Sequence, residues 1–295
     1  MGNMWPKARL LLVVLFAAIV CTPDGQATNS PIPHGTVELI AEPQWIVAGG
    51  NVNFGLHFEL EKGWHIYWIN PGDSGETPRV KWQLPMGLTP RAIEWPAPRR
   101  LGTSSIVDFG YEDAVTLIVP MHADAHLRDQ QSVQLGAQVS VLVCREMCIP
   151  GKAQVSLTLP IKPQAPSADS RTAELFAASR KALPRPAPMN WKLALADDNS
   201  SFLLTVRLGR PVTQAVFYPL VESQMDNAAP QKLLPTPNGF RLTLRKSDQL
   251  LKPIERLKGV LVLSTDQAYL VNVPVGKSPA ATKAPTSELT QQNLR

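Results

Sequence analysis

The sequence predicts an all-β protein that consists of two immunoglobulin-like β-sandwich domains joined by a proline-rich linker with a short helix. Many short segments alternate apolar and polar residues, as half-buried strands do. Turn residues separate these segments at intervals of about ten residues, which is typical of β-sandwiches. The chain of 295 residues has 28 prolines and an aromatic share of 6%, which favours short strands and turns over helical bundles.

The first residues are expected to form a secretory signal peptide. Lys7 and Arg9 precede an apolar run from Leu10 to Val20, and the polar segment that follows ends in Ala27. A basic start, a short apolar stretch and small residues before a cleavage site define such a signal. The run is shorter than the ~20 apolar residues that span a bilayer. We therefore predict cleavage near Ala27 and removal of residues 1–27.

Cleavage would also remove the first of the three cysteines. Cys21 raises the alternative of a lipid anchor, but Val20 precedes it where a small residue is expected. No later segment is long and apolar enough to span a membrane. We expect a mature protein without a membrane span, in an oxidising compartment where disulfides persist.

The first domain is predicted over residues 28–162. Alternating apolar residues mark its strands, as in the segment from Val52 to Leu60. An aromatic-rich strand, Gly63-Trp64-His65-Ile66-Tyr67-Trp68, runs into an Asn-Pro-Gly turn. The predicted strands are residues 36–46, 52–60, 63–68, 80–84, 114–119, 133–143 and 153–159.

Two segments of this domain are expected to lie outside its strands. The prolines of the segment from Trp95 to Pro98 cannot donate to a β-ladder. The segment from Ile106 to Asp113 contains Phe109 and Tyr111 and is predicted to be a loop with exposed aromatic side chains. It leads into the strand that begins at residue 114.

The rest of the chain is expected to form a linker, a second and smaller β-sandwich domain, and a tail. Residues 163–189 hold a helical stretch, Ser170 to Ala182, between proline-rich segments and are interpreted as the linker. Residues 277–295, rich in Ser, Thr, Ala, Pro and Gln, are predicted to be disordered. The second domain, residues 190–276, has predicted strands at 191–196, 202–208, 215–218, 239–244, 259–264 and 268–273.

Cys144 and Cys148 are the two cysteines that remain after cleavage, and they are the strongest candidates for a functional site. They flank Arg145, Glu146 and Met147. A tight hairpin can bring two such cysteines to the Cα separation of about 5.5 Å that a disulfide needs. A disulfide that closes such a short loop would stabilise the folded protein by roughly 2 kcal/mol, whereas one that closes a loop of ~100 residues would contribute more than ~4 kcal/mol. The spacing therefore favours an easily reduced redox pair, while a structural disulfide stays open.

A copper site is a third interpretation. Two thiolates with Met147 between them and a nearby histidine would suit Cu(I), which prefers soft ligands. Two cysteines alone do not form a closed zinc site. The five histidines show no ligand spacing, since His122 and His126 are four apart in a segment without a strong helical pattern. We assign no metal and no cofactor to the chain.

Other chemistries are not indicated. The net charge of +5 is spread along the chain without a basic block, so no nucleic-acid partner is expected. The sequence contains no glycine-rich phosphate loop, no Gly-x-Ser-x-Gly elbow and no His-Glu-x-x-His motif. Asp108, Glu112 and Asp113 are expected to be surface charges of their loop, one of which could act on a nearby thiol.

Several segments carry a resemblance to a known family. In the first half they are Gly63-Trp64-His65-Ile66-Tyr67-Trp68, Asn70-Pro71-Gly72-Asp73-Ser74-Gly75, Trp95-Pro96-Ala97-Pro98-Arg99-Arg100, Asp108-Phe109-Gly110-Tyr111 and Leu142-Val143-Cys144-Arg145-Glu146-Met147-Cys148-Ile149-Pro150. In this order they resemble the periplasmic amino-terminal domain of the thiol–disulfide interchange protein DsbD and, more closely, the related ScsB proteins. Two further segments resemble the second domain of ScsB-like ectodomains, Val216-Phe217-Tyr218-Pro219-Leu220 and Asp226-Asn227-Ala228-Ala229-Pro230.

The resemblance implies a fold and an activity. The family domain is an immunoglobulin-like sandwich whose cysteine pair receives electrons from a membrane-embedded domain through a thioredoxin-like domain and passes them to periplasmic clients. Carried over, Cys144 and Cys148 are the redox pair, and Cys148 forms the mixed disulfide with partners. The family is also associated with cytochrome c assembly and copper tolerance.

The resemblance also implies neighbours of the cysteines. The loop from Asp108 to Tyr111 corresponds to a cap that shields the pair, with Phe109 or Tyr111 over the sulfurs. His65 and Tyr67 fall where the family places aromatic residues beside the site. Ordinary strand packing explains His65 and Tyr67 as well.

Two departures from the family pattern limit the resemblance. The Cys-x3-Cys interval is shorter than that of the DsbD domain, and the membrane and thioredoxin-like domains are missing. We therefore expect a periplasmic thiol–disulfide oxidoreductase that depends on a separate thioredoxin-like or membrane-embedded reductase of the DsbD type. Its clients would be periplasmic disulfide-containing proteins. The alternatives are a non-enzymatic interaction module with a structural disulfide and a Cu(I)-binding protein linked to copper tolerance.

Overall fold

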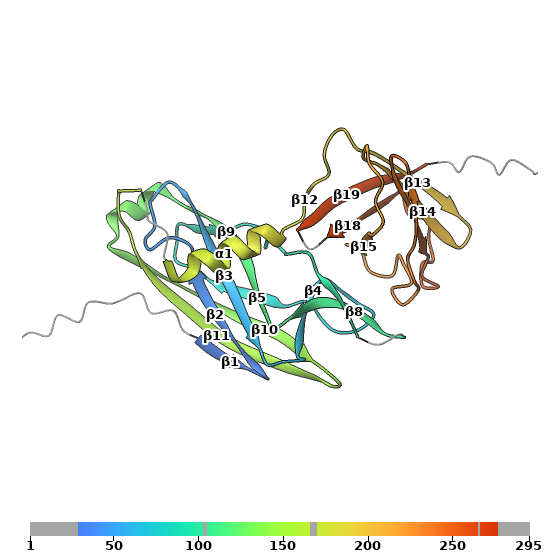
Figure 1. Cartoon of the computed structure of the whole chain (residues 1–295). Helices are drawn as coiled ribbons and strands as arrows, with labels where there is room; N and C mark the ends of the chain where they lie inside the picture. The colour runs from blue at the N-terminus through green and yellow to red at the C-terminus, as the bar shows by residue number, and fades with distance from the viewer. Residues whose placement is uncertain (1–28, 103–104, 166–169, 265, 277–295) are drawn as a thin grey trace, which may run out of the picture.

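The computed structural model of the chain describes residues 29–102, 105–165, 170–264 and 266–276. The predicted signal peptide with Cys21 and the predicted tail lie outside these ranges. Figure 1 shows two β-rich bodies, one formed by strands of the first half of the chain and one by strands of the second half. The prediction of an all-β protein with two immunoglobulin-like domains is confirmed.

The first domain is built from two sheets whose neighbouring strands are antiparallel. One sheet has the order β1 (Asn29–Ile32), β2 (Gly35–Ala41), β3 (Asn51–Leu60), β9 (Ala114–Ala123) and β6 (Leu88–Pro90). The other has the order β11 (Cys148–Pro160), β10 (Ser132–Cys144), β4 (His65–Gly72), β8 (Val107–Glu112) and β7 (Arg99–Gly102), with β5 (Arg79–Gln83) paired to β10. A short 3-10 helix, Ala125–Asp129, connects β9 to β10.

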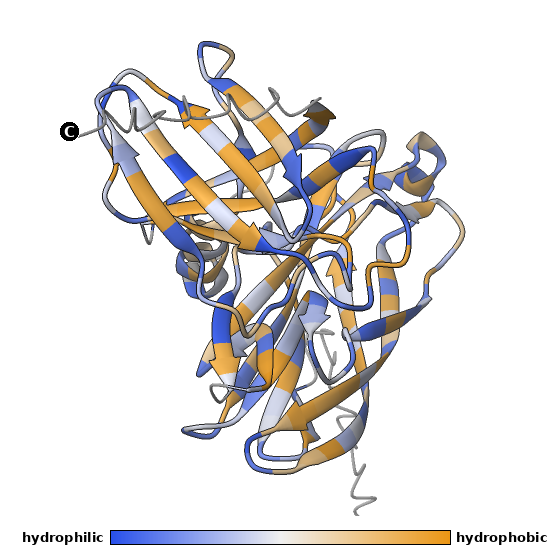
Figure 2. Ribbon diagram, turned by 90° about the vertical axis from the view of Figure 1, so that its right-hand side faces the viewer, coloured by the Kyte–Doolittle hydropathy of each residue, from blue (hydrophilic) through white to orange (hydrophobic). Residues whose placement is uncertain are grey.

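The apolar side chains of the two sheets face each other and form one core. In β10 the odd-numbered residues from Val133 to Val143 are buried in this core, and most even-numbered residues between them are polar or partly exposed. Figure 2 shows the same alternation as bands of hydrophobic and hydrophilic residues along many strands. Burying a side chain of this size stabilises the fold by roughly 1.5–3 kcal/mol. The alternation also means that the side chain of Cys144 points to the face of the sheet opposite to this core.

The helix α1 (Ser170–Ala182) has the predicted bounds and packs on the first domain. Its Phe176 is fully buried against Ile40 and Ile118. Thr172 donates a 2.8 Å hydrogen bond to the Ala41 carbonyl oxygen. Figure 1 shows the helix lying along β3 and β9. The helix therefore covers the outer face of the first sheet and is not a free linker.

The second domain contains an eight-stranded sheet, with seven strands in one path and one strand off it. Its strands are β15 (Val216–Pro219), β18 (Arg256–Ser264), β19 (Gln267–Gly276), β13 (Lys192–Asp198), β14 (Ser201–Arg207), β17 (Gly239–Arg245) and β16 (Lys232–Thr236), with β12 (Arg185–Pro186) paired to β19. Its core includes Phe202, Phe217 and Phe240, which are fully buried. Tyr218 and Val260 pack with the core of the first domain, so apolar contact continues from one domain to the other.

The predicted strands are present, but several others were missed. The segment from Ile106 to Asp113 was predicted to be an exposed loop, and this prediction is wrong, since Val107–Glu112 forms β8 in the middle of a sheet. Val107, Phe109 and Tyr111 alternate into the core and are almost completely buried. The strands β1, β6, β7, β12 and β16 are short edge or connecting strands that were not predicted. Among the described residues, no helix has the length and apolar character needed to cross a membrane.

We predict that Phe176→Ala destabilises the first domain by about 3–5 kcal/mol, because it leaves a cavity between α1 and the sheet. Urea unfolding of the oxidised protein measures the change. The exposed Glu174 on the same helix offers a control, and Glu174→Ala is expected to shift the unfolding free energy by less than about 0.5 kcal/mol. Equal effects of the two substitutions would show that α1 does not depend on this contact.

Candidate functional site

A disulfide between Cys144 and Cys148 closes the end of the longest hairpin of the protein. The strands β10 and β11 pair over thirteen residue pairs, and Cys144 opposite Cys148 is the last of them. The two Cα atoms are 4.1 Å apart. The backbone N–H of Arg145 donates a 3.1 Å hydrogen bond to the Met147 carbonyl oxygen and tightens the turn between the cysteines. The prediction that a hairpin brings the two cysteines together is confirmed.

The two sulfur-bearing residues differ in exposure. Cys144 is buried, with 1% of its surface exposed, whereas Cys148 is exposed at the surface. Thiol–disulfide exchange requires a thiolate to reach one sulfur in line with the bond, so access decides which sulfur is attacked. The geometry therefore favours attack at Cys148 and departure of Cys144.

Strand pairing brings Tyr67 and His65 to the buried sulfur. His65 in β4 is the direct partner of Cys144 in β10, and successive side chains of a strand point to opposite faces. His65 and Tyr67 consequently share the face of Cys144, while Ile66 and Trp68 point into the core. The Tyr67 hydroxyl donates a 2.8 Å hydrogen bond to Cys144 Sγ and lies 3.5 Å from Cys148 Sγ.

Asp108 lies on the same face from the neighbouring strand. In the β4–β8 pairing Gly110 is opposite Tyr67 and Glu112 is opposite His65, which directs the even-numbered residues of β8 toward the disulfide. Asp108 accepts hydrogen bonds from the backbone N–H and the hydroxyl of Ser74, at 3.0 and 2.9 Å. Asp108 is only 6% exposed, so its prediction as a surface charge is wrong.

Burial at this site shifts the pKa values of Tyr67, Asp108 and His65 away from their ordinary values. Burial, and then the nearby Asp108 carboxylate, raise the pKa of Tyr67 to about 12, so its hydroxyl remains a donor across the physiological range. Burial raises the pKa of Asp108 above its ordinary value, against the hydrogen bonds from Ser74. Burial lowers the pKa of His65, although Asp108 and Glu112 oppose the shift. A neutral imidazole beside the sulfurs follows.

The turn from Asp73 to Gly75 covers the outer side of Tyr67. Gly75 has a φ of +86°, and a Cβ atom built on it would lie 2.1 Å from Tyr67 Cζ. The glycine backbone therefore rests directly on the phenol ring, and any larger residue would displace the ring or the turn. This cover was missed in the sequence, although the Asn-Pro-Gly-Asp-Ser-Gly motif that forms it was noticed as a turn.

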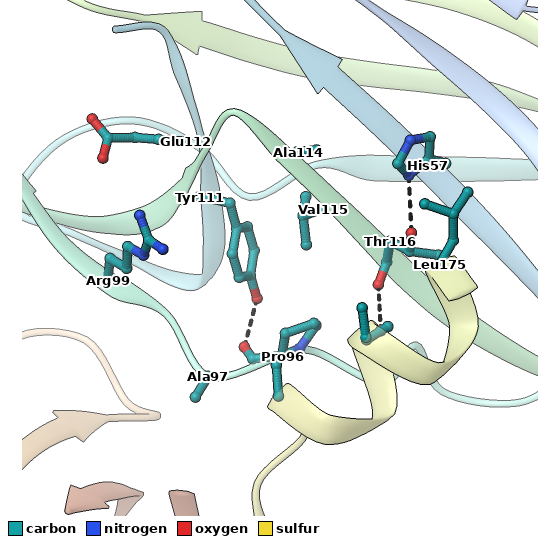
Figure 3. Close-up of a pocket in the computed structure, with 13 residues that line it drawn as sticks. His57, Pro96, Ala97, Arg99, Tyr111, Glu112, Ala114, Val115, Thr116 and Leu175 are labelled. Carbon is teal, nitrogen blue, oxygen red and sulfur yellow. Dashed lines mark hydrogen bonds between the residues drawn. The ribbon is translucent and has the colours of Figure 1, made fainter. Parts of the chain in front are cut away.

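Phe109 and Tyr111, the predicted cap residues, lie on the other face of β8. The Phe109 ring meets the Tyr218 ring of the second domain edge to face, with centroids 5.3 Å apart. The Tyr111 hydroxyl donates a 2.7 Å hydrogen bond to the Pro96 carbonyl oxygen (Figure 3). The structure thus gathers Cys144, Cys148, Tyr67, His65 and Asp108, and it directs Phe109 and Tyr111 into the core.

The turn between the cysteines is anchored by a stack of side chains that sequence reasoning missed. The Arg145 guanidinium lies 5.3 Å from the centre of the Trp64 ring. Trp64 stacks in turn on His34, with centroids 3.6 Å apart and planes within 7°. His34 Nδ1 lies 2.8 Å from Glu61 Oε2. A cation over an aromatic face contributes about 0.5–1 kcal/mol at exposed sites, so the stack restrains the hairpin end.

A separate cavity of about 260 Å³ lies between α1 and the strands β8 and β9. Figure 3 shows His57, Thr116 and Tyr111 around it, with His57 Nδ1 2.9 Å from the Thr116 hydroxyl. Neither cysteine lines this cavity. In the described part of the chain, no group of three or more His, Cys, Asp and Glu side chains is placed to hold a metal ion.

The neutral state of His65 predicts a pH dependence of stability. Since its pKa is lower in the folded than in the unfolded protein, the unfolded chain binds more protons just below the ordinary pKa of 6.5, and stability falls as the pH falls through that value. The slope is at most about 1.4 kcal/mol per pH unit. Asp108, whose pKa is raised, acts with the opposite sign at more acidic pH.

We predict that His65→Gln flattens the fall in unfolding free energy between about pH 7.5 and about pH 6, measured by urea denaturation. The exposed His126 provides the control, and His126→Gln is expected to keep the wild-type slope. A wild-type slope in His65→Gln would show that another group titrates in this range.

Comparisons with known proteins agree with this geometry. Residues 36–160 match the family described as thiol:disulfide interchange protein DsbD, N-terminal. The crystal structure of the N-terminal periplasmic domain of ScsB from Proteus mirabilis is similar in fold, with a TM-score of 0.63 and 18% sequence identity over 83% of this chain and 94% of that chain. No curated protein sequence matches the chain. The segment that matches the DsbD amino-terminal domain family, residues 36–160, is thus the segment that forms the disulfide site.

Proposed function

We propose that this chain is a periplasmic thiol–disulfide exchange protein that relays electrons between a separate reductase and client disulfides. The observation that carries the proposal is the asymmetry of the pair, with Cys148 exposed and Cys144 buried under the Tyr67 hydroxyl. A purely structural disulfide would require neither a hydrogen-bond donor at one sulfur nor solvent access to the other sulfur. The family of residues 36–160 supports the same activity.

Reduction of the chain proceeds in two exchange steps. A thiolate of the donor attacks Cys148 Sγ, and the bond to Cys144 breaks, so that Cys144 leaves as a thiolate. The Tyr67 hydroxyl, 2.8 Å away in the disulfide state, donates to this developing negative charge. The donor's second thiolate then attacks the donor sulfur that is bonded to Cys148. This closes a disulfide within the donor and releases Cys148 as a thiolate. The donor is oxidised by two electrons and the chain is reduced by two electrons.

Delivery to a client is the reverse sequence. The Cys148 thiolate attacks a client disulfide and forms a mixed disulfide, and one client thiolate leaves. The Cys144 thiolate then attacks Cys148 Sγ, which restores the intramolecular bond and releases the reduced client. Burial disfavours the Cys144 thiolate, whereas the hydrogen bond from the Tyr67 hydroxyl favours it. Cys148 is accordingly the intermolecular residue and Cys144 the resolving residue.

The proposed partners follow from the chemistry of the pair and from the family. The electron donor is a thioredoxin-like or membrane-embedded reductase of the DsbD type, and the acceptors are periplasmic proteins with disulfides. The expected signal peptide and the family support the periplasmic location.

The proposal predicts that Cys144→Ser traps partners and Cys148→Ser does not. In Cys144→Ser the exposed Cys148 thiol remains and nothing in the chain resolves its mixed disulfide. Each reduced variant is mixed with a thioredoxin-like protein that retains only its exposed cysteine, activated as a mixed disulfide with thionitrobenzoate, which leaves as the free thiolate. The partner then has no second thiol to resolve the adduct, which is measured by non-reducing electrophoresis and mass spectrometry. We expect at least about tenfold more adduct with Cys144→Ser, since reaction follows exposure of the thiol.

Denatured samples of both variants serve as the control, because unfolding exposes the remaining thiol in each and should equalise the adducts. Equal trapping by the two folded variants, or trapping mainly by Cys148→Ser, would contradict the assigned roles. If neither folded variant formed any adduct, the exchange function itself would be overturned.

A further inference from the structure

The second domain contacts the turn that covers Tyr67. Asn227 Nδ2 donates a 2.8 Å hydrogen bond to Asp73 Oδ1, across 154 positions of sequence. The other carboxylate oxygen of Asp73 accepts a 2.8 Å hydrogen bond from the backbone N–H of Val107 in β8. Asn227 is only 8% exposed, so this bond lies inside the contact between the domains. Asp73 is thus held from both domains at once.

The second-domain side of this contact is internally fixed. Asp226 Oδ1 accepts hydrogen bonds from the backbone N–H groups of Ala228 and Ala229, both at 3.0 Å, which shapes the loop that presents Asn227. Arg245 Nε lies 3.4 Å from the other oxygen of Asp226 and ties the loop to β17. Asn227 is therefore presented by a structured loop.

Two further contacts anchor the same region of the first domain. Asn70, which is buried in β4, donates a 2.8 Å hydrogen bond from Nδ2 to the Pro219 carbonyl oxygen. The Tyr218 ring packs edge to face on Phe109, and also on Trp68 with centroids 6.4 Å apart. The second domain therefore contacts the strands β4 and β8 that carry the site, and it contacts their covering turn.

In the first domain, a continuous series of contacts connects Asp73 to the buried sulfur of Cys144. Ser74, the next residue, donates to Asp108 from both its backbone and its hydroxyl. Gly75 rests on the Tyr67 ring, and the Tyr67 hydroxyl donates to Cys144 Sγ. A rotation of the Tyr67 ring away from Cys144 requires the turn to move.

We propose that the second domain controls access to the resolving cysteine, with Asn227 as the positioning residue. Its hydrogen bond to Asp73 holds the Asp73–Gly75 turn against Tyr67, and Tyr67 keeps Cys144 covered. Loss of the bond lets the turn and the ring move and opens Cys144 to reagents. The inference rests on the proposed function only in taking Cys144 and Cys148 as the reacting pair.

The test is the ratio of the alkylation rates of Cys144 and Cys148 in the reduced full-length protein. Iodoacetamide labels both thiols, and trypsin cleaves after Arg145, which separates them into two peptides for mass spectrometry. Cys148 is exposed and therefore serves as an internal reference for thiolate chemistry in the same molecule. In the wild-type protein we expect Cys144 to react much more slowly than Cys148, because it is buried.

Asn227→Asp places a carboxylate against Asp73 and abolishes the donor. We expect the Cys144 to Cys148 rate ratio to rise about tenfold, the size expected when one hydrogen bond to a charged group is lost. Asn227→Ala removes the donor without adding charge and should raise the ratio in the same direction. The double variant Asn227→Asp with Asp73→Asn exchanges donor and acceptor, and an amide at position 73 can still accept from Val107. We expect this exchange to restore the wild-type ratio within about twofold.

Asn53 provides the matched control in the first domain. Asn53 lies in β3, in the sheet that does not carry the disulfide, and its Nδ2 donates a 2.9 Å hydrogen bond to Glu42 Oε2. Asn53→Ala therefore removes an amide–carboxylate bond of similar length away from the disulfide. We expect the ratio to stay at the wild-type value. A wild-type ratio in both Asn227 variants, or no recovery in the double variant, would overturn the proposal.

The alkylation ratio tests the role of Asn227 separately from the exchange function. An unchanged ratio in a wild-type chain that exchanges disulfides would overturn only the role of Asn227. A raised and rescued ratio in a chain that forms no mixed disulfide would support the positioning by the second domain and overturn only the exchange function.

Discussion

The hydrogen bond from the Tyr67 hydroxyl to Cys144 Sγ is the interaction on which the site depends. It requires β4 to pair with β10 so that His65 lies opposite Cys144, because a shift by one residue would send Tyr67 into the core. That register is set by the apolar faces of the two strands, which fill the core on the other side of the sheet. Packing of the core therefore determines the chemistry on the outer face.

The outer face of this sheet is covered at Tyr67, beside the disulfide. The Gly75 backbone rests on the Tyr67 ring. Burial at this site raises the pKa values of Tyr67 and Asp108 and lowers that of His65. Cys148 remains outside this cover. A single disulfide thus has one sulfur in a dry, hydrogen-bonded environment and the other at the surface. The second domain contributes to that difference by holding the turn.

Much of the fold was predictable, because long alternating strands and the helix from Ser170 to Ala182 carry strong local patterns. The strand β8 was not, since Asp108, Gly110 and the flanking charges suggested a loop, and its alternation of Val107, Phe109 and Tyr111 was overlooked. The cysteine pair was evident from its spacing. Its contacts were not, because the register between β4 and β10 and the bond between Asn227 and Asp73 join residues far apart in the chain. Long-range pairing of this kind leaves no periodic signal in one sequence.

In the proposed function, the Cys144–Cys148 bond is an exchangeable bond and not a structural one. An equilibrium titration of the oxidised protein in thiol–disulfide buffers, followed by alkylation of the free thiols, measures its midpoint potential. We expect a midpoint potential between about −180 and about −270 mV, the range of proteins that exchange disulfides with partners. A value well below about −300 mV, as structural disulfides of secreted proteins show, would contradict it.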